Sequence, residues 1–222
     1  MKKGFFITGT DTGVGKTWAT VALMRYFKNQ GQSVIGMKPV AAGCEWQDGV
    51  LKNEDAILMQ ENASLELDYQ KINPCAFEMP VSPHLAAGED SVQLNIIEKA
   101  FDDLKEKADV ILVEGAGGWL APLSNECDIA DLAKKLQLPV ILVVAIRLGC
   151  INHARLTFQA IQTDKVECAG WVAMCVDPEM LKQSENIATI KDKISAPLLG
   201  VLPYSERMDF DLLAMKIKSI DI

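Results

Sequence analysis

The stretch Gly-Thr-Asp-Thr-Gly-Val-Gly-Lys-Thr at residues 9–17 decides the fold of this 222-residue chain. It follows an apolar run at residues 5–7 and leads directly into a helical pattern at residues 16–29. A glycine-rich turn between a strand and a helix exposes backbone N–H groups to phosphate oxygens, and the helix N-terminus adds a positive dipole. The stretch therefore predicts a triphosphate-binding loop, in which Lys16 reaches the terminal phosphates and the Thr17 hydroxyl binds Mg²⁺.

One detail of this loop departs from the general pattern. The pattern places four residues between its two glycines, whereas Gly9 and Gly15 enclose five residues in this chain. The Gly-Lys-Thr ending, the strand before it and the helix after it all agree with the pattern. We therefore prefer a phosphate loop over an ordinary glycine-rich turn that carries a surface lysine.

Apolar runs separated by helical patterns indicate an α/β fold. The runs lie at residues 5–8, 34–37, 110–113, 140–145, 170–176 and 198–202. Several lack polar alternation, which is typical of parallel strands covered on both faces. Helical patterns lie at residues 16–29, 91–107, 127–137, 151–163 and 181–193. The sequence predicts one P-loop NTPase-like domain over residues 1–222, with a doubly wound, mostly parallel sheet and helices on both faces. Residues 39–90 are the least regular stretch, and only a helix start near Asp55 is predicted there.

The composition limits the class of protein. Lys and Arg total 22 against 30 Asp and Glu, and the net charge of −8 argues against nucleic acid or an anionic membrane as the main partner. No apolar span has the roughly 18 residues that a membrane helix needs, and residues 1–4 leave no room for a cleaved signal. The six cysteines form no C-x-x-C pair, which favours reduced thiols. We therefore expect a cytoplasmic protein.

Three charged residues outside the loop are placed to complete a phosphoryl-transfer site. Lys38 follows the second strand, where its charge can offset the negative charge that develops on a transferring phosphoryl group. Glu114 ends the third strand and Asp55 lies near a helix start, so both carboxylates can hold Mg²⁺. The glycine-rich residues 115–118 let the backbone approach a nucleotide. A solvated surface charge is the alternative interpretation of each charged residue taken alone.

A second anion site is predicted at residues 148–153, Leu-Gly-Cys-Ile-Asn-His, which again link a buried strand to a helix. Backbone N–H groups at such a helix start suit a carboxylate. Cys150 and His153 are each more consistent with packing than with catalysis, because no base or second thiol is adjacent in sequence. Trp119 and Trp171 are likewise more typical of a core.

Five segments together resemble the dethiobiotin synthetase family of biotin biosynthesis, and they occur in the order expected for it. They are residues 9–17, 38–40, 114–119, 149–153 and 170–172. The extra residue in the phosphate loop is a trait of this family. The resemblance covers nearly the whole chain and implies an ATP- and Mg²⁺-dependent ligase that forms a cyclic urea. CO₂ would carbamylate an amine of 7,8-diaminopelargonate, ATP would convert the carbamate to a carbamic-phosphoric anhydride, and the second amine would displace phosphate.

The resemblance also implies roles for individual residues. Lys16, Lys38 and Thr12 would act in catalysis, and Thr17, Asp55 and Glu114 would hold Mg²⁺. The implied ATP-binding residues are Gly13, Val14, Gly15, Lys16, Thr17, Trp18, Asp55, Glu114, Gly115, Ala116, Gly117, Met174, Cys175, Pro203, Tyr204 and Ser205. The implied substrate-binding residues are Lys38, Ala42, Gly149, Cys150 and Asn152. The family is active as a homodimer, in which residues 149–152 would receive the substrate's tail carboxylate from the partner subunit's site.

Three positions depart from the residues usual in that family. Gly13 stands where many relatives have Glu, although a backbone donor tolerates this change. Ala42 stands where Ser commonly contacts the carbamylating amine. Met174 and Cys175 replace an Asn-Asp pair that recognises adenine. The segment after Ser205 departs as well, and no nucleotide-contacting acid is identified in it.

Other classes of P-loop protein are the alternatives. Partitioning-type ATPases carry a signature lysine five residues before the conserved one, where this chain has Asp11. Related amidoligases usually carry a glutaminase domain, for which this chain is too short. A degenerate paralogue would share the fold with weakened activity.

Overall fold

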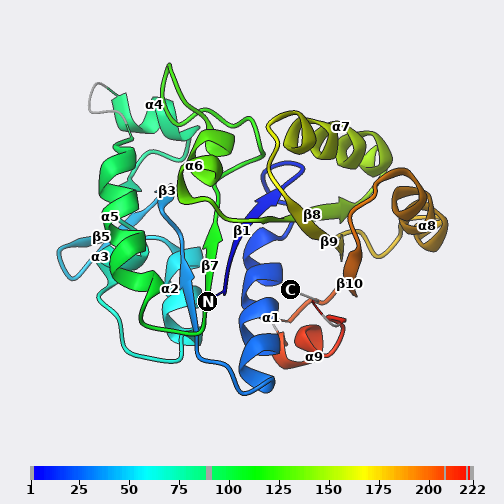
Figure 1. Cartoon of the computed structure of the whole chain (residues 1–222), viewed down its shortest axis with the longest axis horizontal. Coiled ribbons are helices and arrows are strands. Elements are labelled where there is room, and N and C mark those ends of the chain that lie inside the picture. The colour runs from blue at the N-terminus through cyan, green and yellow to red at the C-terminus, as the bar shows by residue number, and fades with distance from the viewer. Residues whose placement is uncertain (1–2, 89–91, 208, 219, 221–222) are drawn as a thin grey trace.

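The central sheet of the protein is built from parallel strands (Figure 1). A computed structural model describes residues 3–88, 92–207, 209–218 and 220, and within these ranges the sheet has six strands in the order β10-β9-β8-β1-β7-β2. They are β1 (Lys3–Gly9), β2 (Val34–Met37), β7 (Val110–Glu114), β8 (Val140–Ile146), β9 (Cys168–Cys175) and β10 (Leu198–Leu202). The strand order reverses at β1, and ligands of open α/β sheets bind at the carboxyl edge beside such a point.

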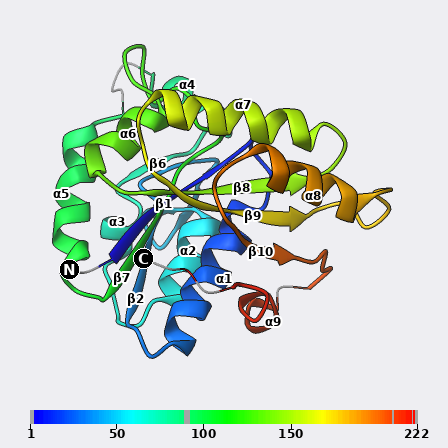
Figure 2. The ribbon, with the colours of Figure 1, turned by 45° about the vertical axis from the view of Figure 1, so that its right-hand side comes forward.

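Helices cover both faces of this sheet (Figure 2). One side carries α1 (Lys16–Asn29), α2 (Glu54–Asn62) and the short α9 (Phe210–Ala214). The other side carries α5 (Leu94–Lys105), α6 (Ile129–Leu136), α7 (Cys150–Thr163) and α8 (Gln183–Lys193). This arrangement confirms the doubly wound, P-loop type of fold that the sequence predicted.

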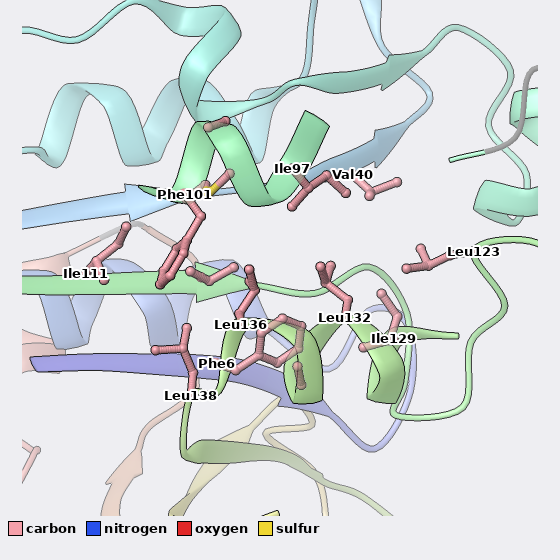
Figure 3. Close-up of a cluster of buried hydrophobic side chains, with 14 of the residues drawn as sticks. Phe6, Val40, Ile97, Phe101, Ile111, Leu123, Ile129, Leu132, Leu136 and Leu138 are labelled. Carbon is pink, nitrogen blue, oxygen red and sulfur yellow. The ribbon is translucent and has the colours of Figure 1, made fainter. Parts of the chain in front are cut away.

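Apolar side chains fill a separate core on each face of the sheet. Phe6 of β1 lies in the core beneath α5 and α6, where it packs in one cluster with Leu132 and Leu136 (Figure 3). Its neighbours Phe5 and Ile7 are buried in the core on the α1 face. Both faces of β1 are therefore apolar, which explains the lack of polar alternation at residues 5–7. Full burial of one such side chain contributes about 1.5–3 kcal/mol to folding.

The predicted strands and helices are present, with small differences at their ends. The helix predicted at residues 127–137 begins at Ile129, because the Asp128 side chain caps it by accepting a hydrogen bond from the backbone N–H of Asp131 at 3.2 Å. The helix predicted at residues 91–107 is α5, and position 91 lies outside the described residues. The other elements that differ at an end include β9, predicted at residues 170–176, and α8, predicted at residues 181–193.

The described part of residues 39–90, where the sequence predicted little, contains several short elements. They are β3 (Val40–Ala42), β4 (Glu45–Gln47), β5 (Val50–Lys52), α3 (Tyr69–Ile72), β6 (Cys75–Phe77) and α4 (Pro83–Ala87). β3 and β6 pair in parallel, whereas β4 and β5 form a hairpin whose turn uses the left-handed angles of Asp48 and Gly49. The hairpin leads to Asn53, whose side chain accepts a hydrogen bond from the N–H of Asp55 at 3.1 Å and caps α2. The predicted helix start near Asp55 is confirmed.

Two further sequence expectations concern the membrane and the thiols. Among the described residues, each helix is too short or too polar to span a bilayer. All six cysteines are free thiols, as predicted. Burial raises the pKa of Cys75 to about 11, so this thiol stays protonated and unreactive.

Candidate active site

A cleft with a volume of about 1070 Å³ opens at the carboxyl edge of the sheet, beside the reversal of strand order at β1. Its walls come from the phosphate loop, the segment after β2, the start of α2, the loop after β7 and part of α7. The predicted site residues that line it are Thr12, Gly13, Gly15, Lys16, Thr17, Trp18, Lys38, Ala42, Asp55, Glu114, Ala116 and Gly117. Residues far apart in the sequence therefore meet where this fold binds its ligands.

The phosphate loop joins the end of β1 to the start of α1 and depends on two glycines. Gly13 and Gly15 have left-handed backbone angles, with φ of 69° and 82°, which glycine adopts without steric penalty. A Cβ atom on Gly15 would also lie 2.7 Å from Met174 Cγ, whereas one on Gly13 would meet no atom within 4 Å. Gly15 is thus required by both backbone angle and packing. Gly13 is favoured by its backbone angle alone.

Lys16 is buried at the end of this loop. Its side-chain ammonium donates a hydrogen bond to the carbonyl oxygen of Asp11 at 2.9 Å. Burial, together with the nearby charge of Lys38, lowers the pKa of Lys16 to about 8. A group of phosphate oxygens at this point would offset the repulsion between the two cations. The two lysines therefore bring two positive charges close together at the end of the phosphate loop.

Lys38 lies between two carboxylates that come from different elements. Its Nζ is 2.6 Å from Glu114 Oε1 at the end of β7 and 2.9 Å from Asp55 Oδ2 on the first turn of α2. Burial by itself lowers the pKa of Lys38, but the two carboxylates outweigh burial and raise the pKa above its ordinary value. Burial likewise opposes the charged form of Asp55, yet the charge of Lys38 holds the pKa of Asp55 below its ordinary value. Lys38 and Asp55 are therefore both kept ionised around neutral pH.

Glu114 is completely buried and forms the centre of this cluster. Its Oε1 accepts hydrogen bonds from the Thr17 hydroxyl at 3.0 Å and from Lys38, and its Oε2 accepts one from the Thr20 hydroxyl at 2.7 Å. A buried carboxylate is tolerated only when its lone pairs are satisfied in this way. The network fixes the orientation of Glu114 relative to the first turns of α1.

The oxygen atoms of this cluster suit Mg²⁺. Thr17, Asp55 and Glu114 supply one hydroxyl and two carboxylates, and hard oxygen donors of this kind are the ligands that Mg²⁺ prefers. Within the described residues, no group of three or more His, Cys, Asp or Glu side chains is suited to a metal. One hydroxyl and two carboxylates would suit a cation that takes few protein ligands and completes its shell with phosphate and water.

The other predicted site residues lie outside the cleft. They are Val14, Gly115, Gly149, Cys150, Asn152, Met174, Cys175, Pro203, Tyr204 and Ser205. Met174 and Cys175 are buried at the end of β9, and Met174 packs against Gly15. Gly149 and Cys150 begin α7, and Asn152 is exposed on its first turn. Most of these residues follow the carboxyl ends of strands, on the same edge of the sheet as the cleft.

The sequence did not predict several parts of the cleft. Among them are residues 80–83, and Leu156, Thr157 and Ala160 of α7. No sequence pattern marks them, since they reach the cleft only through the packing of distant segments. Thr20, which does not line the cleft but donates a hydrogen bond to Glu114, had a usable signal, because it lies one helical turn after Lys16 and so faces the same side of α1.

Comparison with known proteins gives the family. Residues 3–210 match a family described as an AAA domain. A protein of Xanthomonas oryzae pv. oryzae (strain PXO99A) named ATP-dependent dethiobiotin synthetase BioD is 46% identical over 202 residues, 90% of each chain. A protein of the same name from Xanthomonas axonopodis pv. citri is 47% identical over 92% of each chain. One from Nitrosospira multiformis is 46% identical over 94% of this chain and 92% of its own. The chain belongs to the dethiobiotin synthetase family. The resemblance seen in five sequence segments is thereby confirmed.

Solved structures share the fold at lower identity. The MinD cell division protein of Aquifex aeolicus superposes with a TM-score of 0.59 at 18% identity, over 96% of this chain and 87% of its own. The septum site-determining protein MinD of Pyrococcus horikoshii, complexed with Mg-ADP, superposes with a TM-score of 0.60 at 15% identity, over 97% and 94%. At such identities the likeness shows the fold alone. Partitioning-type ATPases have a signature lysine at the position of Asp11. In this chain Asp11 Oδ2 instead lies 3.0 Å from Arg147 Nη2, as its ion-pair partner.

Proposed function

We propose that the cleft closes the cyclic urea of dethiobiotin from 7,8-diaminopelargonate and CO₂, with ATP as co-substrate and ADP and phosphate as products. One observation carries the proposal: buried Lys16, Lys38 and Glu114 cluster with the partly exposed Asp55 at the phosphate loop, in a chain of the dethiobiotin synthetase family. Phosphoryl transfer depends on positioning and charge neutralisation more than on a side-chain nucleophile. The cluster offers both.

The reaction balances in three steps. One amine of the substrate adds to CO₂ and loses a proton, which leaves a carbamate. A carbamate oxygen then attacks the γ-phosphorus of ATP, and the bond from that phosphorus to ADP breaks. Finally, the second amine attacks the carbamoyl carbon, phosphate leaves with the electron pair of the C–O bond, and the ring closes as the amine loses a proton.

The residues of the cleft have separate roles in this scheme. Lys16 and the backbone N–H groups of the phosphate loop would bind the β- and γ-phosphates. Lys38 is held by Glu114 and Asp55. It would offset the negative charge that develops in the transition states of the second and third steps, where such stabilisation raises the rate. Thr12 lies beside Gly117 in the wall of the cleft, where a Cβ added to Gly117 would be 3.7 Å from the Thr12 hydroxyl oxygen. We assign Thr12 to the boundary between phosphate and substrate.

Thr17, Asp55 and Glu114 would hold Mg²⁺. When bound, this cation would neutralise charge on the phosphates and on the leaving ADP. The same two carboxylates position Lys38, so the cluster couples the binding of the cation to the position of the lysine. Lys38 also holds the pKa of Asp55 low, which keeps Asp55 available as an anionic ligand.

We further propose a homodimer in which residues 149–152 of one subunit bind the tail carboxylate of a substrate in the other. The start of α7 at Gly149 has no side-chain cap, and such a helix start suits a carboxylate. Leu148 is 94% exposed, and Leu120 and Leu156 at the cleft are 63% and 58% exposed. An interface between subunits would cover these apolar side chains. Free thiols support a cytoplasmic location.

Phosphate release tests the reaction directly. The protein is mixed with diaminopelargonate, bicarbonate and Mg·ATP, and phosphate and dethiobiotin are measured together. We expect the two products to form in equal amounts and only when the diamine is present. Phosphate release at the same rate without the diamine would contradict the proposal, because it would identify a simple ATPase.

A further inference from the structure

We infer that Asp164 is a positioning residue for the part of the cleft that binds the diamine, and that it acts through Trp119. The inference rests on the proposed function, because it concerns how that substrate is held. Asp164 itself does not line the cleft, and it is 45 residues from Trp119 in the sequence. Only the fold brings the two side chains together.

Trp119 is held from two sides. It follows the glycine-rich residues after β7, and its ring is almost wholly buried although it lines the cleft. Its indole N–H donates a hydrogen bond to Asp164 Oδ2 at 2.7 Å. Its backbone carbonyl accepts a hydrogen bond from the N–H of Ala130, at the start of α6, at 3.0 Å. The main chain of this loop is therefore tied to α6, and its ring is tied to the end of α7.

Asp164 is an unfavourable residue for its own helix. It occupies the C-cap of α7, where the partial negative charge of the helix dipole disfavours a carboxylate. Lys134 offsets little of this cost, because its Nζ is 3.6 Å from Asp164 Oδ1 but 2.7 Å from Asp131 Oδ1. A neutral or cationic residue would suit the helix better. The hydrogen bond to the buried indole, which needs an acceptor, is the favourable interaction that accounts for an acid here.

The bond joins two parts of one cleft wall. Leu120 and Ala121 follow Trp119 and line the cleft, as do Leu156 and Thr157 of α7. Buried Phe158 and Ile161 hold α7 on the sheet whether or not Asp164 is present. Losing the bond should therefore release the Trp119 ring and widen this wall, while the main chain of the loop stays bonded to α6 and the helix α7 stays in place. The lysines and carboxylates that handle phosphate make no contact with Asp164, so ATP binding should change little.

Steady-state kinetics of single variants of the full chain test this inference. We expect Asp164→Leu to raise the KM for diaminopelargonate by up to about tenfold, because the substrate must then order the wall that the hydrogen bond to a charged group had held in place, while the KM for ATP changes by less than about twofold. Trp119→Phe, which keeps an aromatic ring without the donor, should match it. Asp164→Asn, which keeps an acceptor oxygen, should have a KM for diaminopelargonate close to that of the unaltered protein. The double variant should be no worse than either single variant, since both remove the same bond.

Asp103→Leu is the matched control. Asp103 forms a 3.0 Å ion pair with Lys71 on the exposed side of α5, so the same replacement there should leave both KM values unchanged. The inference is wrong if Asp164→Leu and Trp119→Phe lower the melting temperature but leave the KM for the diamine unchanged, or if both KM values rise together. If Asp164→Leu does not fold, Trp119→Phe and Asp164→Asn decide. An unaltered protein without diamine-dependent phosphate release would instead overturn the proposed function, and the inference with it.

Discussion

Replacing Lys38 by methionine removes the buried cation that lies between Glu114 and Asp55. Lys38 Nζ lies 2.6 Å from Glu114 and 2.9 Å from Asp55, so the replacement leaves Glu114 buried with hydrogen bonds from Thr17 and Thr20 alone. Removing one partner of a buried ion pair typically costs about 3–5 kcal/mol. Because the two hydroxyl groups still satisfy Glu114 in part, we expect a loss of about 2–4 kcal/mol in the free energy of unfolding.

The effect on catalysis should be separate from this loss of stability. A preorganised charge that stabilises a transition state typically contributes about 100- to 1000-fold in kcat. We therefore expect Lys38→Met to lower kcat by about 100-fold or more, while the Kd for ATP changes by less than about threefold. ATP affinity should survive because Lys16 and the phosphate loop, which we propose as the groups that bind the phosphates in the ground state, are unaltered.

Three measurements decide this prediction. Urea unfolding shows what fraction of the variant is folded under assay conditions, calorimetry gives the Kd for Mg·ATP, and phosphate release at saturating diamine gives kcat. Lys71→Met is the control, because Lys71 forms an exposed ion pair with Asp103 and such pairs contribute little. A folded Lys38→Met protein with the kcat of the unaltered protein would refute the catalytic role of Lys38 and leave it a structural counter-ion of Glu114.

Three further predictions concern protonation, base selectivity and assembly. Burial and Lys38 lower the pKa of Lys16 to about 8, and the negative charge of bound phosphate raises this pKa again. ATP binding should therefore take up about half a proton at pH 8 and almost none at pH 6.5. Calorimetry in buffers of different ionisation enthalpy measures the proton uptake, and an uptake that does not grow with pH would contradict the prediction. Met174→Asn should raise the preference in kcat/KM for ATP over CTP about tenfold, since Met174 offers no hydrogen bond to a base edge; an unaltered strict preference for ATP, with Met174→Leu as the control, would mean that other groups recognise the base. Leu148→Glu should weaken the dimer and lower activity, as measured by sedimentation at assay concentrations, and a fully active monomer would contradict a shared site at residues 149–152.

The local chemistry of the site follows from short stretches of sequence. Residues 9–17 identify a phosphate loop because glycines and a Gly-Lys-Thr ending between a strand and a helix have few other uses. Lys38 and Glu114 were predicted for the same site because the carboxyl ends of parallel strands meet at one edge of a sheet. The structure brings these residues within hydrogen-bonding distance.

The short elements of residues 39–90 were not predictable in the same way. Strands of three residues, such as β3 and β6, show no periodicity, and their pairing depends on partners more than 30 positions away. Residues 80–83 line the cleft for the same reason. Local propensity is weak in such segments, so tertiary packing decides their structure.

The sequence by itself determined which functional groups occur along this chain and in what order. They are a phosphate loop, a lysine, two carboxylates and a second helix start, each near the end or start of a predicted element. Only the tertiary structure decided how these groups are paired. It placed Lys38 between Glu114 and Asp55, set Met174 against Gly15, and joined Trp119 to Asp164. The physical reason is that hydrogen bonds and ion pairs depend on distances of about 3 Å between side chains, and sequence spacing carries no information about such distances once the chain has folded back on itself.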